Sequence, residues 1–255
     1  MSKDTNEGGF ISHLVELRKR LINTLIFLFG LFIICYLFSD YIYGFLVEPY
    51  AAAVKDDTVD RRLIFTALQE TFLTYLKVSF FTAFFFTSPF ILIQIWKFIA
   101  PGLYEHEKSA IIPYFVITPV LFLLGGMLVY YLIMPLAIKF FLSFESIGTA
   151  TNLPIQLEAK VNEYLSLVMK LIFAFGISFQ LPVVLSLLAR IGIVDSQFLK
   201  ERRKYVVIII FATAALLTPP DPITQIGLAI PLLILYELSI LSVKVTEKNR
   251  DKDNA

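Results

Sequence analysis

Long apolar runs constrain this chain more than any other feature of its sequence. A helix needs about 20 mostly apolar residues to cross roughly 30 Å of hydrocarbon, where lipid offers the backbone no hydrogen-bonding partner. Residues 21–38, 72–95, 111–138 and 164–188 each form such a run, and residues 223–243 form a further one after a turn rich in proline. With 57% hydrophobic and 17% charged residues, the 255-residue chain resembles a membrane protein rather than a water-soluble domain.

The fifth run, residues 205–217, is the short one. Its 13 or so residues would extend only about 20 Å as a helix, so it either crosses a thinned bilayer or forms a buried or re-entrant segment. We expect it to cross. The prediction is an all-α polytopic protein with six transmembrane helices, of which the fifth and sixth are short, between a cytoplasmic segment at 1–20 and a cytoplasmic tail at 244–255.

The distribution of basic residues predicts that both termini are cytoplasmic. Of the 22 lysines and arginines, 15 fall inside with this orientation, before the first span, after the second, after the fourth and in the tail. The outer segments hold the other seven, diluted by acids, so the positive-inside rule favours an even number of spans. Lys77 and Lys170 lie near outer span ends, where a long side chain can reach the interface without a functional role.

Several kinds of chemistry are missing from the predicted membrane segments. The two histidines, His13 and His106, both fall in predicted cytoplasmic segments, and Cys35 is the only cysteine. No metal site, cofactor or catalytic residue is therefore predicted, and the nearly neutral charge gives no reason to expect nucleic acid. Binding or transport is the favoured class of function.

Three motifs stand at the ends of the predicted spans. The first, His13 to Leu21, reads HLVELRKRL and leads into the first span; the second, Gln94 to Lys108, is an aromatic loop broken by Pro101. The third, Leu216 to Asp221, reads LLTPPD and is followed by Gln225. Alone, the first motif indicates a juxtamembrane anchor with a local ion pair between Glu16 and Arg20, which lie four residues apart on a helix. The second indicates an interfacial aromatic belt and the third a stiff outer turn.

Together and in this order, the motifs resemble those of the TatC family of the twin-arginine protein translocase. The stretches Ala174 to Pro182 (AFGISFQLP) and Ala229 to Pro231 (AIP) add to the resemblance, which covers nearly the whole chain. It implies a cup-shaped, six-span protein of the bacterial plasma membrane that exports folded proteins with the proton-motive force. The implied partners are twin-arginine signal peptides, TatA and TatB type single-span subunits, lipid and further copies of the chain. A secondary transporter for a small solute or ion is the alternative function.

The resemblance also implies which residues bind the signal peptide. Two adjacent arginines require carboxylates at the membrane surface, and Glu16 and Glu107 match the family's acidic positions. Without the family, Glu107 reads as a solvated loop acid. The other predicted binding residues are Arg18, Lys19, Phe98, Pro101 and Tyr104, although Arg18 and Lys19 equally suit contacts with lipid phosphates.

A second set of residues is predicted to make structural contacts or contacts with partner helices. Gln180 lies in an apolar span, where relatives often carry glutamate, and an amide there can hydrogen-bond but cannot carry a proton. Pro49 falls in the first outer loop, at a position that the family retains. The remaining members of the set lie near the last two spans: Thr218, Asp221, Gln225 and Glu237. For Thr218, Gln225 and Glu237, snorkelling to the interface or helix capping is the alternative.

Overall fold

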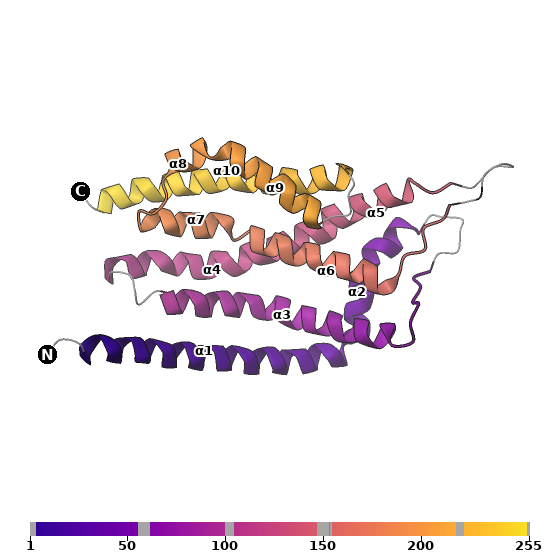
Figure 1. Cartoon of the computed structure of the whole chain (residues 1–255), viewed down its shortest axis with the longest axis horizontal. Helices are drawn as coiled ribbons and strands as arrows, with labels where there is room; N and C mark the ends of the chain where they lie inside the picture. The colour runs from indigo at the N-terminus through magenta and orange to yellow at the C-terminus, as the bar shows by residue number, and fades with distance from the viewer. Residues whose placement is uncertain are drawn as a thin grey trace. The chain divides into compact units, whose positions relative to one another are not determined.

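The computed structural model describes the backbone of residues 4–55, 62–99, 105–146, 153, 155–217 and 222–253. Side chains are described for residues 14–55, 62–95, 116–146, 153, 155–217, 222 and 224–248. Over these residues the chain is helical apart from short connections, with two isolated β-bridges and no sheet (Figure 1). The all-α prediction is confirmed.

Ten α-helices and one π-helical turn follow each other along the described chain. They are α1 (Asp4–Leu37), α2 (Ser39–Ala53), α3 (Glu70–Ile99), α4 (Glu105–Leu128), η2 (Val129–Ile133), α5 (Met134–Leu142), α6 (Val161–Ser178), α7 (Leu181–Arg190), α8 (Ser196–Glu201), α9 (Arg203–Leu217) and α10 (Pro222–Asp253). Helix α2 lies within the segment that the sequence analysis assigns to an outer loop. The fourth predicted span is divided at Phe179 and Gln180, just before Pro182, which has no amide proton for the helix ladder.

Five candidate membrane spans are found among the described residues by length and composition. They are Leu14–Leu37, Glu70–Ile95, Val116–Leu142, Val161–Arg190 and Thr224–Lys248. Helix α9 is a further apolar helix, and its 15 residues extend only about 22 Å. Because α9 is one unbroken helix, the chain does not turn back within it.

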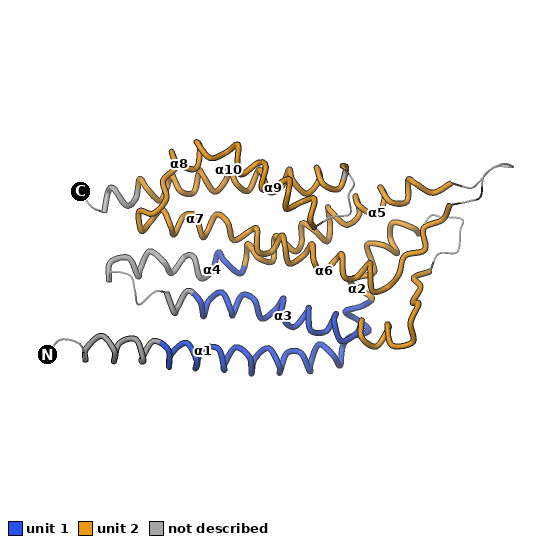
Figure 2. The backbone as a smooth tube through the Cα atoms, in the orientation of Figure 1, with its two compact units in different colours: residues 1–43, 75–119 blue, residues 44–74, 120–255 orange. Residues whose placement is uncertain are grey.

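The chain divides into two compact units, described here one at a time (Figure 2). The first unit comprises residues 1–43 and 75–119, and its described side chains belong mainly to α1 and α3. These helices run antiparallel: the rings of Phe27 and Phe90 lie 5.1 Å apart, and those of Phe32 and Phe80 lie 6.2 Å apart. Aromatic contacts of this kind fill the space between the two helices.

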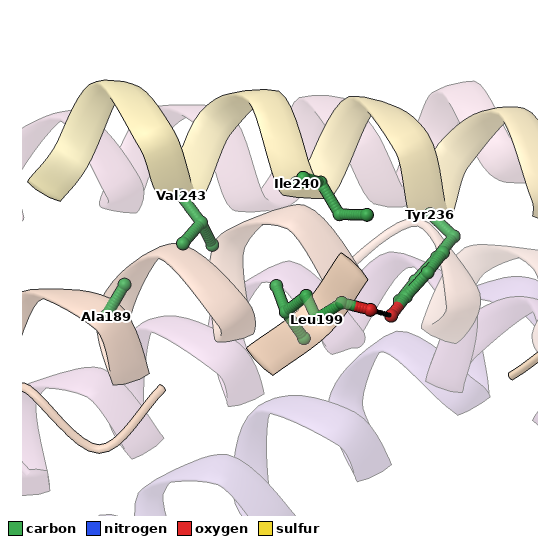
Figure 3. Packing of buried hydrophobic residues seen from close by; sticks show 5 residues of the cluster. All are labelled: Ala189, Leu199, Tyr236, Ile240 and Val243. Atoms are coloured by element: carbon green, nitrogen blue, oxygen red, sulfur yellow. Dashed lines mark hydrogen bonds between the residues drawn. The ribbon is translucent and has the colours of Figure 1, made fainter. Parts of the chain in front are cut away.

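The second unit comprises residues 44–74 and 120–255. Helices α7, α8 and α10 enclose a cluster formed by Ala189, Leu199, Tyr236, Ile240 and Val243 (Figure 3). The hydroxyl of Tyr236 donates to the carbonyl of Leu199 at 2.8 Å, which fixes the short helix α8 against α10. Between α7 and α10, the hydroxyls of Ser186 and Ser242 lie 2.6 Å apart.

Helix α9 packs against α10 in the opposite direction. Arg203, the first residue of α9, pairs with Glu237, whereas the carbonyl of Phe211 further along α9 accepts from Gln225 near the start of α10. An antiparallel pair is the arrangement expected of two consecutive helices that each traverse the same layer.

Candidate functional site

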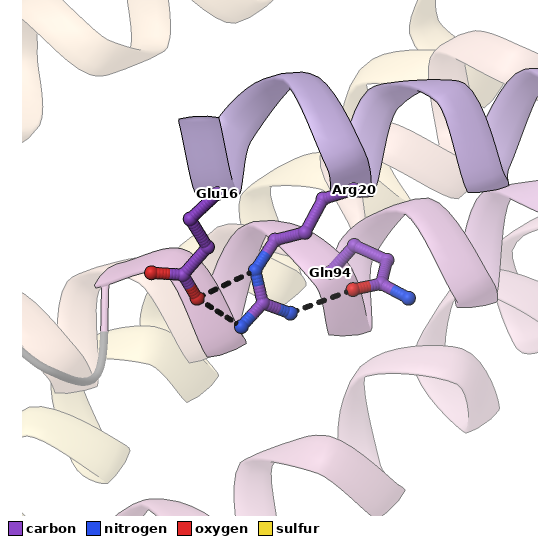
Figure 4. Close-up of polar contacts among 3 residues, drawn as sticks. All are labelled: Glu16, Arg20 and Gln94. Carbon is purple, nitrogen blue, oxygen red and sulfur yellow. Dashed lines mark hydrogen bonds and ion pairs between the residues drawn. The ribbon is translucent and has the colours of Figure 1, made fainter. Parts of the chain in front are cut away.

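The first candidate position is the predicted cytoplasmic end of α1, where three polar side chains meet (Figure 4). Arg20 donates to Oε1 of Glu16 through both Nε, at 3.0 Å, and Nη2, at 2.5 Å. Its Nη1 donates to Oε1 of Gln94 on α3 at 2.8 Å. The four-residue spacing puts Glu16 and Arg20 on one helix face, and the antiparallel packing of α3 brings Gln94 to them.

Glu16 is only partly sheltered. Its side chain is 36% exposed and that of Arg20 is 24% exposed. The second carboxylate oxygen, Oε2, points away from Arg20 and accepts no hydrogen bond from the described side chains (Figure 4). One oxygen of Glu16 therefore remains available to a further donor, while Arg18 and Lys19 beside it are exposed.

The predicted loop residues are described only in part. Phe98 lies in the last turn of α3 and Glu107 in the first turn of α4, but their side chains are outside the described set. Pro101 and Tyr104 lie outside the described residues altogether. The chain between Ile99 and Glu105 can reach at most about 22 Å, so α4 begins near the end of α3.

Gln180 lies at the break between α6 and α7. Its side chain is buried, at 7% exposure, and its Nε2 donates to the carbonyl of Gly176 at 3.4 Å. The side-chain amide of Gln180 thus donates to a backbone carbonyl of the same span, at the point where the helix is interrupted. Within the described residues, no group of three His, Cys, Asp or Glu side chains is placed to hold a metal ion.

Two of the four residues assigned to the last spans have described contacts. Gln225 joins α10 to α9 by its bond to the carbonyl of Phe211 at 3.1 Å, and Glu237 makes an ion pair with Arg203 at 2.6 Å. Both members of that ion pair are about half exposed. Thr218 and Asp221 lie outside the described residues.

Pro49 is buried inside α2 rather than in an irregular loop. Because proline has no amide proton, the carbonyl of Phe45 four residues earlier lacks its helical donor. The hydroxyl of Tyr130 in the π-helical turn η2 donates to that carbonyl at 2.7 Å, and the Tyr130 ring stacks on Phe45 with centroids 4.4 Å apart. Tyr164 on α6 donates to the next carbonyl, that of Leu46, at 3.1 Å. Two tyrosines thus fix α2 to the rest of its unit.

The ion pair between Glu16 and Arg20 is confirmed, but the sequence analysis missed Gln94 and Tyr130 and did not place Arg20 in the binding site. Arg20 had a usable signal, since it is the i+4 neighbour of Glu16, but Gln94 lies 74 residues away in the chain. Pro49 signals that the carbonyl of Phe45 needs a donor, yet nothing local indicates that Tyr130 supplies it.

Comparison with known proteins supports the resemblance. A family model described as "Sec-independent protein translocase protein (TatC)" matches residues 12–231. The Sec-independent protein translocase protein TatC of Magnetococcus marinus is 47% identical over 98% of this chain and 89% of its own length. That of Rickettsia prowazekii is 48% identical over 95% of each chain.

A solved structure shares the fold as well. The crystal structure described as "Twin Arginine Translocase Receptor- TatC" superposes with a TM-score of 0.76 at 37% identity, covering 92% of this chain and 99% of that one. The apolar spans, the helix order and these matches agree with one another. The chain therefore belongs to the TatC family of Sec-independent protein translocase proteins and is a multi-pass protein of the bacterial inner membrane.

Proposed function

We propose that this chain is the receptor and core subunit of a twin-arginine translocase, and that it binds signal peptides through carboxylates at its cytoplasmic face. The observation that carries the proposal is Glu16: a partly sheltered carboxylate at the end of α1, with one oxygen open, that already accepts a guanidinium. The protein acts here by recognition, as a component of a protein translocase.

The chemistry of arginine explains why such a carboxylate suits the ligand. A guanidinium is always charged and presents a planar fork of donors that matches a carboxylate. An exposed ion pair contributes only about 0–1 kcal/mol, whereas charge-assisted hydrogen bonds in a sheltered site reach about 1.5–3 kcal/mol. The partial shelter of Glu16 therefore favours useful affinity.

Two arginines require a second acid, and we assign this role to Glu107 at the start of α4. Phe98, Pro101 and Tyr104 would hold apolar parts of the peptide, and Arg18 and Lys19 would shape the site or contact lipid phosphates. All of these residues belong to the first unit of the chain.

The proposed partners are TatA and TatB type single-span subunits and further copies of the chain. Helices α9 and α10 offer polar groups at membrane depth, including Gln225 and Glu237, which suit contacts with partner helices. Thr218 and Asp221 belong to the same proposal. We further propose that the complex uses the proton-motive force to export folded cargo; Gln180 is an amide and carries no titrating proton in that process.

Site-specific photo-crosslinking tests the receptor role. A photoreactive residue at position 98, which leaves both proposed acids in place, should crosslink to a synthetic twin-arginine peptide several times more efficiently than to a matched twin-lysine peptide. Equal crosslinking to both peptides would defeat the proposal.

A pair of substitutions tests the two acids. Glu16→Ala combined with Glu107→Ala should abolish peptide binding, because both arginines lose their carboxylates, while membrane insertion and thermal stability stay close to those of the parent protein. Glu163→Ala, which removes a 72% exposed carboxylate elsewhere, is the matched control and should retain binding. If the double variant still binds the peptide, the carboxylate assignment is wrong.

A further inference from the structure

The carboxylate assigned to the peptide is already occupied by a guanidinium of the same chain. We propose that Arg20, held in place by Gln94, is an internal competitor for the arginine of the signal peptide at Glu16. This inference rests on the proposed function, since it concerns the affinity of that same site. It adds two residues, Arg20 and Gln94, as determinants of how tightly and how selectively the peptide binds.

The geometry explains why Arg20 competes with an arginine in particular. Nε and Nη2 of Arg20 both donate to one oxygen, Oε1 of Glu16, and Oε2 is the open one. A bidentate arginine–carboxylate pair uses both oxygens, so an incoming guanidinium forms its full fork only after Arg20 leaves Oε1. A lysine ammonium is a point charge that can use Oε2 alone. Arg20 therefore weakens the binding of arginine more than that of lysine.

Gln94 determines where Arg20 rests. The hydrogen bond from Nη1 to Oε1 of Gln94, at 2.8 Å, is the one hydrogen bond between helices within this group of three side chains, and it holds the guanidinium that also contacts Glu16 (Figure 4). Gln94 is uncharged, so its replacement loosens Arg20 without changing the net charge of the site. This separates competition at Glu16 from general repulsion between the site and a cationic peptide.

The internal pair is weak enough to be exchanged. It joins residues four apart on one helix, and both side chains remain partly open to water. An ion pair of this kind, with one additional charge-assisted hydrogen bond, should raise the dissociation constant of a competing peptide arginine about three- to tenfold.

The test measures peptide affinity on the full-length protein in detergent, with fluorescent twin-arginine and twin-lysine peptides and four proteins: the parent, Arg20→Lys, Gln94→Ala and Glu16→Gln. Arg20→Lys keeps the charge but loses the fork, and should lower the Kd for the twin-arginine peptide about three- to tenfold, with a smaller change for twin-lysine. Gln94→Ala should change the Kd for each of the two peptides in the same direction as Arg20→Lys does, but by a smaller factor.

The outcomes separate this inference from the proposed function. If the parent protein does not prefer the twin-arginine peptide, or if Glu16→Gln binds it as well as the parent does, the proposed function fails. The second case is that the parent prefers the twin-arginine peptide and Glu16→Gln binds it more weakly, as the proposed function requires. If Gln94→Ala then leaves the twin-arginine Kd unchanged or raises it, the proposed competition by Arg20 is wrong. Gln94→Ala decides the matter even where Arg20→Lys does not fold.

Discussion

At the level of single residues, Tyr130 supplies the hydrogen bond that the backbone of Pro49 cannot donate. Replacing Tyr130 by Phe keeps the ring that stacks on Phe45 but removes the donor to the Phe45 carbonyl. A carbonyl left without its partner costs about 1–3 kcal/mol, so Tyr130→Phe should lower the free energy of unfolding by that amount. Thermal unfolding of the purified protein measures the loss, and Tyr131→Phe, at a neighbouring ring that is 71% exposed, is the control.

A double-mutant cycle shows whether the missing amide of Pro49 is the cause. In Pro49→Ala the new residue supplies the amide proton that the helix lacks at this position, so the Phe45 carbonyl no longer depends on Tyr130. Tyr130→Phe should therefore cost less in the Pro49→Ala background than in the parent. Equal costs in the two backgrounds would show that the hydroxyl of Tyr130 does not replace the proline amide.

This pair also marks what sequence can and cannot predict about single residues. The resemblance singled out Pro49 without its partner, because the hydrogen bond joins residues 85 apart in the chain. Glu16 was predicted from the family resemblance, because its motif next to the first apolar run is a local feature of the sequence. Gln94 was not, because its role depends on the antiparallel packing of α1 and α3.

At the level of helices, glycines set how closely α4 and α6 approach. A Cβ built on Gly125 would lie 2.7 Å from the carbonyl oxygen of Phe175, and one on Gly176 would lie 2.7 Å from the ring of Phe122. Small residues at such positions let two helix backbones pack closely in a membrane. Gly125→Ala should therefore destabilise the protein by about 1–3 kcal/mol, because a backbone carbonyl cannot easily move aside.

Gly227 in α10 is the matched control, since a Cβ there would meet nothing within 4 Å. Gly227→Ala should be neutral or stabilise the helix by about 0.5–1 kcal/mol. Both variants are measured by thermal unfolding and by the yield of folded protein from the membrane. A Gly125→Ala protein as stable as Gly227→Ala would contradict the close packing of α4 and α6.

The helices themselves follow from the sequence to different degrees. Long apolar runs predict membrane helices because lipid offers the backbone amides and carbonyls no hydrogen-bonding partner, so they must bond to one another within a helix. Helix α2 escaped prediction, since its 15 residues contain a proline and its place depends on Tyr130 and Tyr164. The break at Gln180 was also missed. Pro182 indicates that one helical hydrogen bond is lost, but it does not indicate whether the helix bends or ends and begins again.

For the whole molecule, the orientation in the membrane depends on whether α9 crosses. With α9 as a span, the chain crosses six times and both termini are cytoplasmic, in line with the 15 of 22 basic residues placed inside. Without it, the five candidate spans would put the C-terminal end of α10 outside. The 15 residues of α9 require a bilayer that is locally thin, which costs fractions of a kcal/mol per Å of mismatch, on the order of a few kcal/mol in total.

Cysteine labelling of intact cells decides between these arrangements. In a Cys35→Ser background, Leu68→Cys, at a side chain that is 97% exposed before α3, should react with a membrane-impermeant maleimide from outside. Lys248→Cys, exposed near the end of α10, should react only after the membrane is made permeable. Reaction of Lys248→Cys in intact cells would mean that α9 does not cross the membrane. The chain would then have an odd number of spans, and the end of α10 would lie on the opposite side of the membrane from the beginning of α1 and from Glu16.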